Sequence, residues 1–178
     1  MTTWFTADTH FSHANIIKYS NRPFSSVEEM NYKLIANWNS KVAQYDTVRF
    51  VGDFCFTDLE KGQAIFDQLN GVKHLITGNH DKIAVQIKGW KSISQFEEVK
   101  VEGQTITLCH YAMRVWNKSH YGAWMLYGHS HGSLPDDPAA LSIDVGVDCH
   151  NYQPINMDEV SRIMKRKTWK AVDHHAKR

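Results

Sequence analysis

The chain has 178 residues, of which 42% are hydrophobic; this excludes a disordered chain and allows one well-buried core, so we expect a single domain over residues 1–178. Its 20 basic and 19 acidic residues leave a formal charge of +1, which excludes a general attraction to nucleic acid or to an anionic membrane. Three widely spaced cysteines, and no apolar run of signal-peptide or membrane-spanning length, favour a cytoplasmic location.

The first half of the sequence alternates short apolar runs with longer amphipathic segments. Each run is rich in β-branched or aromatic residues and stops at a polar cluster, which is typical of a buried strand. The segments between the runs are long enough for crossover helices, so parallel strands are expected. The predicted strands are Trp4–Ala7, Thr47–Val51 and Val72–Thr77, and the predicted helices are Val27–Val42 and Leu59–Leu69, with a helical turn around Ile16 and Ile17.

The second half of the sequence is richer in strands. A Glu102-Gly103 turn between Ile93–Val101 and Gln104–Cys109 predicts an antiparallel hairpin. The charged tail over residues 165–178, with His174 and His175, is expected to be frayed and to hold no metal. The remaining predicted elements are strands at Trp124–Tyr127 and Leu141–Val147 and a helix at Met157–Met164.

This order of elements predicts an α/β fold, or α+β by some schemes. A βαβαβ unit followed by a β-rich half is typical of two mixed sheets packed face to face with helices outside, a four-layer α-β-β-α sandwich. Ligands of open α/β sheets bind outside the carboxyl ends of the parallel strands. We therefore expect the functional site at the polar clusters that follow the predicted strands.

Residue types that bind metals recur at these strand ends. Each cluster alone has a second interpretation as a turn or a helix cap, but their repetition along the chain favours one shared site. Because residues i and i+2 of an extended chain point to the same side, Asp8 with His10, and His129 with His131, can each present two ligands. This number of oxygen and nitrogen donors is too large for one tetrahedral ion and predicts two metal ions. Mn²⁺ is the preferred metal, with Fe²⁺, Zn²⁺, Ni²⁺ or Mg²⁺ as alternatives. The candidate ligands are Asp8, His10, Asp53, Asn79, His110, His129 and His131.

These residues form motif blocks that resemble a known family. The sequence is similar in every expected block, and in their order, to the calcineurin-like metallophosphoesterase superfamily. The segment from Asp8 to Ile16 resembles its short stand-alone bacterial and phage members in particular. The blocks are Asp8-x-His10, Gly52-Asp53, Gly78-Asn79-His80-Asp81, His110 and Gly128-His129-Ser130-His131.

The resemblance implies a division of the ligands between two metal ions. A shared anion would offset the repulsion between two dications, and a bridging water with a lowered pKa, present as hydroxide, would be the nucleophile. By resemblance, Asp8, His10 and His131 would hold the first ion, Asn79, His110 and His129 the second, and Asp53 would bridge both.

The resemblance also implies two catalytic residues. His80 would protonate the leaving oxygen or stabilise the transition state, although a buried, hydrogen-bonded histidine is the alternative. Asp81 would orient the ring of His80. Family members often carry arginine at the next position, where this chain has Lys82, so a bidentate grip on phosphate is not expected there.

Several further residues are candidates for binding the substrate. Arg114 and Arg22 could hold phosphate oxygens as guanidinium forks, or could be ordinary surface arginines. His13 and Asn15 could line the cleft, although loop capping explains them nearly as well. An aromatic group that could stack a base, but that fits a buried core better, comprises Tyr111, Trp116, His120 and Tyr121.

The function that these patterns favour is hydrolysis of phosphate esters. We expect a metal-dependent phosphodiesterase that acts on a small nucleotide-like or nucleic-acid-end substrate. The neutral overall charge argues against a processive nuclease. A phosphomonoesterase, including one that acts on phosphoprotein, is the first alternative, and a non-catalytic binding module with the same fold is the second.

Overall fold

The first half of the chain builds a mainly parallel sheet. In the computed structural model, which describes residues 1–173, this first sheet consists of β1 (Thr3–Thr6), β2 (Thr47–Phe50), β3 (Val72–Ile76), β4 (Ser92–Ser94) and β9 (Ile155–Asn156). The strand order is β4-β3-β2-β1-β9. The strands β1 to β4 run parallel, whereas β9 pairs antiparallel with β1. The parallel strands therefore end at one edge, as the sequence predicts.

A second mixed sheet follows in the chain. It consists of β5 (Phe96–Val101), β6 (Gln104–Cys109), β7 (Trp124–Tyr127) and β8 (Ser142–Asp144), in that order. The β5–β6 hairpin is antiparallel, and β6, β7 and β8 run parallel. The strand expected over Ile93–Val101 is divided at Gln95, because β4 pairs with β3 in the first sheet and β5 pairs with β6 in the second.

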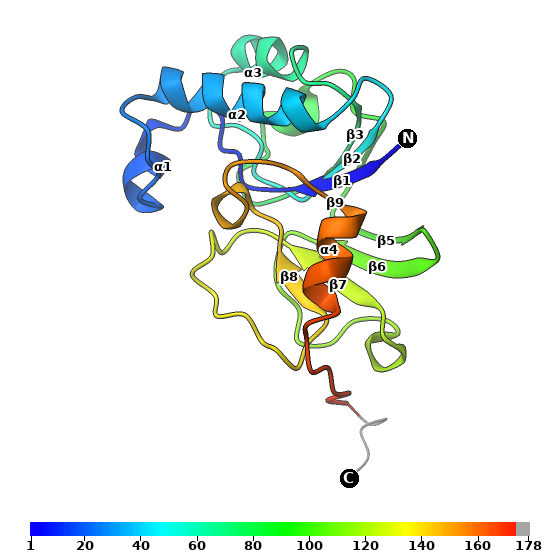
Figure 1. The fold of residues 1–178 in the computed structure, drawn as a ribbon. Coiled ribbons are helices and arrows are strands. Elements are labelled where there is room, and N and C mark those ends of the chain that lie inside the picture. The colour runs from blue at the N-terminus through cyan, green and yellow to red at the C-terminus, as the bar shows by residue number, and fades with distance from the viewer. Residues whose placement is uncertain (174–178) are drawn as a thin grey trace.

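Helices connect and cover the strands of the first sheet. The α-helices are α1 (Ala14–Tyr19), α2 (Val27–Lys41), α3 (Leu59–Phe66) and α4 (Met157–Met164), and the short 3-10 turns are η1 (Ala84–Gln86), η2 (Ser119–Tyr121) and η3 (Val147–Cys149). Helix α2 begins at Ser26, whose side chain caps it, and buries Met30, Leu34 and Trp38 at four-residue spacing. Figure 1 shows α2 and α3 on the face of the first sheet that is turned away from the second sheet.

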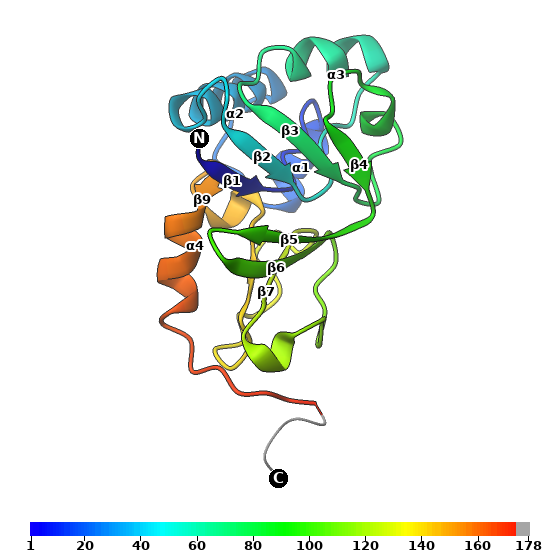
Figure 2. The ribbon, with the colours of Figure 1, turned by 90° about the vertical axis from the view of Figure 1, so that its right-hand side faces the viewer.

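Two apolar cores result from this stacking. One lies between the first sheet and helices α1 to α3 and includes Phe11, Trp38 and Phe50. The other lies between the sheets, where Phe5 and Leu126 are fully buried and residues of α4 join them. Figure 2 shows α4 beside β9 and the second sheet. The predicted α/β fold with two mixed sheets is confirmed.

The segment after α4 differs from the expected frayed tail. The N–H groups of Thr168 and Lys170 donate to the carbonyls of Pro138 and Ala139, and Lys167 binds Asp136. These bonds hold residues 167–170 against the 133–140 loop, whereas residues 174–178, with both tail histidines, lie outside the described part of the chain. Within residues 1–173 no helix has the length and apolarity needed to cross a membrane.

Candidate metal centre

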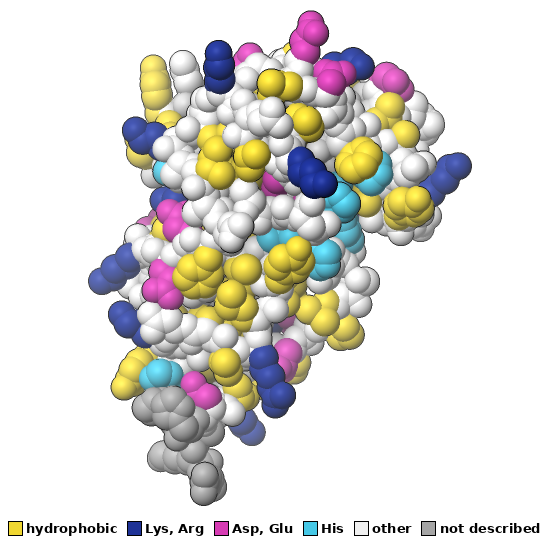
Figure 3. Space-filling view, turned by 180° about the vertical axis from the view of Figure 1, so that it is seen from behind, with side chains coloured by type: hydrophobic (Ala, Val, Ile, Leu, Met, Phe, Trp, Pro, Cys, Tyr) yellow, Lys and Arg dark blue, Asp and Glu magenta, His cyan; other side chains and the backbone are white. Residues whose placement is uncertain are grey.

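The candidate ligands come together where strands of both sheets end. Asp8 and His10 follow β1, Asp53 follows β2, and Asn79 follows β3. The second sheet contributes His110 after β6, and His129 and His131 after β7. Figure 3 shows histidine side chains gathered on one face of the molecule, bordered by hydrophobic side chains.

The ligand atoms form two groups. Those of Asp8, His10 and His131 all lie within 4.8 Å of one another, and so do those of Asp53, His110 and His129. The Oδ2 atom of Asp53 lies 3.5 Å from His10 Nε2 and 3.4 Å from His110 Nε2. The carboxylate of Asp53 therefore lies between the two groups.

Asn79 belongs to the second group. Its Oδ1 atom lies 3.2 Å from His110 Nε2 and 3.1 Å from His129 Nδ1. An amide oxygen at this position adds a neutral oxygen donor to two imidazoles and a carboxylate, a donor set that suits first-row divalent ions.

The backbone at the centre adopts conformations that non-glycine residues rarely take. Asp8, His10, Asp53, His129 and His131 have φ values between 47° and 68°. Such left-handed residues are uncommon outside glycine, and they cluster at functional sites where the surrounding structure enforces them. The strain lies at the ligands themselves, which indicates that the fold constrains their directions.

Two glycines allow the strand-end loops to come close together. A Cβ atom on Gly52 would overlap the ring of His110, and one on Gly78 would overlap the carboxylate of Asp53. Any side chain at either position would displace a candidate ligand. The Gly-Asp and Gly-Asn pairs of the sequence motif thus have a steric cause.

Two of the histidine rings are oriented by partners on their Nδ1 atoms. His110 Nδ1 lies 2.9 Å from the carbonyl oxygen of Val51, and His131 Nδ1 lies 2.7 Å from Asp148 Oδ2. When Nδ1–H donates to these oxygens, the Nε2 lone pair is left for a metal, the usual arrangement of metal-binding histidines.

The unpartnered atoms of His10 test whether metal ions fit. Both ring nitrogens of His10 are buried and have no hydrogen-bond partner among the described residues. Burial lowers the pKa of His10 to about 3, so the ring is neutral and its lone pair is free. Burial also raises the pKa of Asp8 to about 7, a cost that a bound cation would offset. The residues present fit two divalent ions.

Asp53 and His110 stabilise the charged forms of each other's side chains. Burial alone would raise the pKa of Asp53, but the hydrogen bond and charge of His110 lower it to about 2. Burial alone would lower the pKa of His110, but Asp53 raises it to about 9. A metal ion in the second group must therefore displace a proton from His110.

Asp81 does not orient the ring of His80, in contrast to the expectation from sequence. Its carboxylate accepts hydrogen bonds from the N–H groups of Asp53 at 2.9 Å, Phe54 at 2.8 Å and Gly78 at 2.7 Å. Three backbone donors already occupy this buried side chain. Asp81 therefore joins the loops that carry Asp53 and Asn79.

Arg22 is not a substrate-binding residue in this structure. Its guanidinium is buried and donates to both carboxylate oxygens of Asp148, each at 2.8 Å, and to the carbonyls of Asp8 and Thr9. The remaining N–H donor lies 3.5 Å from Met30 Sδ, so all five donors of the guanidinium are directed at the protein and none is left for a phosphate group. Arg22 instead supports Asp148, which in turn contacts the candidate ligand His131.

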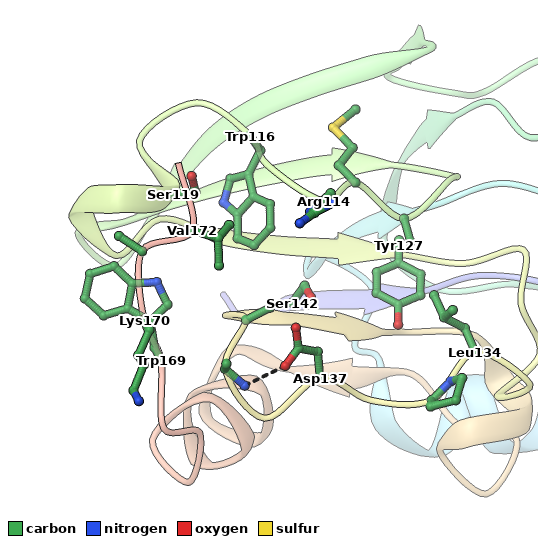
Figure 4. Close-up of a pocket in the computed structure, with 16 residues that line it drawn as sticks. Arg114, Trp116, Ser119, Tyr127, Leu134, Asp137, Ser142, Trp169, Lys170 and Val172 are labelled. Atoms are coloured by element: carbon green, nitrogen blue, oxygen red, sulfur yellow. Dashed lines mark hydrogen bonds between the residues drawn. The ribbon is translucent and has the colours of Figure 1, made fainter. Parts of the chain in front are cut away.

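Of the other predicted substrate contacts, only His13 lies close to the candidate ligands. Arg114 is exposed and lines a pocket with Trp116 and Tyr127 that includes none of the candidate ligands (Figure 4). His13 lies close to the centre, with its ring centroid 5.4 Å from that of His10, whereas Asn15 is exposed at the start of α1.

His80 lies at the edge of the centre with an exposed side chain. Its ring centroid is 5.6 Å from that of His10, and its N–H donates to Asp53 Oδ1 at 2.9 Å. It is therefore not the buried histidine of the alternative interpretation. An exposed imidazole beside the ligand groups can reach a bound substrate.

Sequence reasoning missed Asp148 and Phe56. Asp148 is the partner of both Arg22 and His131, and it lies in η3, far from them in sequence. Phe56 stacks on the ring of His13 at a centroid distance of 4.4 Å. Its position three residues after Asp53, near a strand end, was the available signal.

Comparison of the sequence with known proteins identifies similar chains. The family model described as calcineurin-like phosphoesterase superfamily domain matches residues 1–142. A protein of Methanocaldococcus jannaschii, described as uncharacterized, is 36% identical over 167 residues, which cover 90% of this chain and 89% of that protein. The gene 66 protein of Mycobacterium phage L5 is 39% identical over 84 residues, 44% of this chain and 39% of that protein.

Two solved structures share the fold. A protein of unknown function from Aquifex aeolicus superposes with a TM-score of 0.71 at 23% identity, over 91% of this chain and 98% of that one. A novel archaeal phosphodiesterase superposes with a TM-score of 0.53 at 21% identity, over 82% of this chain and 84% of that one. At these identities the likeness concerns the fold.

Proposed function

Because the chain belongs to the calcineurin-like phosphoesterase superfamily, we propose that it is a phosphodiesterase that depends on two divalent metal ions, with manganese the preferred metal. The observation that carries the proposal is the position of Asp53, whose Oδ2 atom lies within 3.5 Å of a histidine from each ligand group. One carboxylate between two sets of donors is the arrangement that a pair of cations needs.

The reaction follows from the groups around this carboxylate. When bound, the two cations would polarise the phosphate and lower the pKa of a water molecule. The water oxygen forms a new bond to phosphorus while the bond from phosphorus to the leaving oxygen breaks. The leaving oxygen then needs a proton, and the exposed ring of His80 is placed beside the centre to supply it.

The chain's own residues hold this arrangement in place. Asp8 accepts from the N–H of His129 with both carboxylate oxygens, at 3.1 and 2.9 Å, which links the two ligand groups. Asp81 fixes the loops of Asp53 and Asn79, as described above. Such bonds preorganise the ligands before substrate binds, which is the condition for strong electrostatic catalysis.

The preferred substrate class is a small diester that carries a nucleotide-like group. The formal charge of +1 gives no long positive groove for many backbone phosphates, so a short substrate or a nucleic-acid end fits better than a long duplex. A phosphomonoesterase would use the same ligands.

Turnover of two chromogenic esters tests the proposal. The metal-stripped chain is loaded with Mn²⁺ and incubated with bis(nitrophenyl) phosphate and with nitrophenyl phosphate. We expect cleavage of the diester to be the faster reaction and to vanish when the metal is removed. Faster cleavage of the monoester would replace the diesterase with a monoesterase, and no cleavage of either would favour a binding module.

A further inference from the structure

A pocket opens beside the candidate metal centre on the side of His80. It has a volume of about 640 Å³, which lies within the range of roughly 300–1,000 Å³ typical of small-molecule sites. Because the candidate ligand Asn79 and its neighbour His80 both form part of its wall, the pocket adjoins the centre. Its lining residues are Cys55, Phe56, Thr57, Asn79, His80, Lys82 and Ile83.

Phe56 is an exposed aromatic residue in a fixed position. Its side chain is 53% exposed, although a phenylalanine of the core would be covered. The N–H of Phe56 donates to the carbonyl of Phe11 at 2.9 Å, and the ring stacks on His13 at 4.4 Å. The ring of His80 approaches it edge-on at 5.8 Å. A ring held in this way is a preformed surface for stacking another ring.

The position of His80 tells which part of a substrate enters this pocket. A general acid must lie within hydrogen-bond reach of the leaving oxygen. His80 forms a wall of the pocket, so the group attached to that oxygen lies in the pocket. The leaving group, and not the group retained on phosphorus, thus meets Phe56.

The charge of the pocket limits the chemistry of that leaving group. Lys82 is a cation in the wall, and none of the described residues that line the pocket carries a carboxylate. Phe56 and Ile83 supply apolar surface. A flat ring with polar edges and a nearby anionic group matches this wall better than an aliphatic alcohol does.

We propose that this pocket binds a nucleoside as the leaving group of the diester, with its base stacked on Phe56. The inference rests on the proposed function for the distinction between the leaving group and the group retained on phosphorus. It adds Phe56 as the residue that selects the substrate. Phe56 is then a specificity-determining residue, and its ring contributes more to binding of the leaving group than to binding of the phosphate.

Binding of three phosphonates, which resist hydrolysis, tests the pocket. Calorimetry with the Mn²⁺-loaded chain compares methylphosphonate, benzylphosphonate and an adenine phosphonate with a short acyclic linker. We expect the adenine compound to bind on the order of tenfold tighter than methylphosphonate, the scale of one base stacked on an aromatic ring. In Phe56→Leu this ratio should approach one while the affinity for methylphosphonate is unchanged.

A matched variant separates the pocket from a general effect of losing an exposed ring. Tyr45 is 70% exposed in the loop before β2, at the opposite end of the sheet, so Tyr45→Leu should keep the preference. Equal binding of all three phosphonates by the unmodified chain, or an equal loss for all three in Phe56→Leu, would overturn the inference. A gain for the benzyl compound alone would overturn the assignment to nucleosides.

Measuring ester cleavage by the same protein samples tests the proposed function independently of the pocket. A chain that cleaves bis(nitrophenyl) phosphate but shows no preference for a ring refutes the pocket alone. A chain that prefers the adenine phosphonate but cleaves no ester keeps Phe56 as a base-stacking residue and refutes both the hydrolase and the assignment of the pocket to a leaving group.

Discussion

The carboxylate of Asp148 binds both His131 and Arg22. Its Oδ2 atom lies 2.7 Å from His131 Nδ1, and its two oxygens accept from the guanidinium of Arg22. Burial alone would raise the pKa of Asp148, but the hydrogen bonds and charges of His131 and Arg22 lower it. The carboxylate of Asp148 therefore stays ionised. A buried arginine thus supports a candidate metal ligand through one carboxylate, which fixes the direction of the His131 ring.

The first prediction concerns this carboxylate. In Asp148→Asn the side chain keeps its shape but loses its charge, so it holds His131 less firmly and leaves the positive charge of Arg22 without a counter-ion. We expect one of the two Mn²⁺ ions to bind roughly 10–100-fold more weakly, because removal of a partner behind a ligand has effects of this size. Calorimetric titration of the metal-stripped chain should then resolve one tight site and one weak site.

A control distinguishes this effect from simple destabilisation. Asp58 caps α3 through its bond to the N–H of Lys61, so Asp58→Asn also removes a carboxylate with a hydrogen-bonding role. It should leave both Mn²⁺ affinities unchanged. Equal weakening of both ions in Asp148→Asn would contradict the link to His131.

The second prediction concerns the carboxylate between the two ligand groups. In Asp53→Asn the amide oxygen can still accept from the N–H of His80, so the chain should fold. The anion between the cations is lost, however, and turnover of the diester should fall by more than the roughly 10–100-fold loss caused by changing an outer partner. Circular dichroism verifies the fold, and near-normal turnover would refute the bridge.

The third prediction uses the leaving group to test His80. In His80→Ala the metal affinities should stay the same, while turnover of an alkyl diester should fall by about 10²–10⁴-fold, the usual contribution of a general acid. Nitrophenolate departs without a proton, so the loss should be much smaller for a nitrophenyl diester. An equal loss for both esters, or a loss of metal, would assign His80 another role.

The fourth prediction follows from the three hydrogen bonds of Asp81. In Asp81→Ala the buried N–H groups of Asp53 and Phe54 and the half-buried N–H of Gly78 lose their acceptor, at a cost of about 1–3 kcal/mol for each buried donor left unsatisfied. Urea unfolding should show a clear loss of stability, with weaker metal binding. A stable chain that loses only turnover would restore Asp81 to the role expected from sequence.

The sequence predicts that the candidate ligands come together because they lie next to recognisable strand ends. Asp8, Asp53 and Asn79 each follow an apolar run, and parallel strands of one sheet end at the same edge. The sequence predicts one strand at Ile93–Val101, because nothing in its alternation shows that the chain passes between sheets at Gln95. Local periodicity describes a strand but not the partner with which it pairs.

The supporting residues were harder to predict, since their partners are distant in the sequence. Arg22 and Asp148 are 126 positions apart, and an arginine in a polar loop resembles a surface residue until its burial is known. Asp81 is adjacent to His80 in sequence, yet its side chain turns to the backbone of other loops. Only the three-dimensional arrangement shows which neighbour a polar side chain selects.

A lysine of the first sheet offers a further test, which concerns stability. Lys73 on β3 is only 7% exposed, and its Nζ atom donates to the carbonyls of Leu69 at 2.6 Å and Gly71 at 3.2 Å. It also lies 4.3 Å from the centroid of the Phe66 ring. Burial lowers the pKa of Lys73 to about 8, although the charge of Asp67 acts in the opposite direction.

The fifth prediction is that the free energy of unfolding rises between neutral and alkaline pH, because Lys73 loses its charge more readily in the folded chain than in the unfolded chain. Below pH 8 the amine is charged in both states, and above its unfolded pKa of about 10.4 it is neutral in both. Between these values the unfolded chain binds more protons, so stability rises with pH, by at most about 3 kcal/mol. Urea unfolding at pH 7 and at about pH 10 should show this rise in the unmodified chain and in Lys100→Met, which replaces an exposed lysine. Lys73→Met should lack it, and the same pH dependence in all three chains would contradict the prediction.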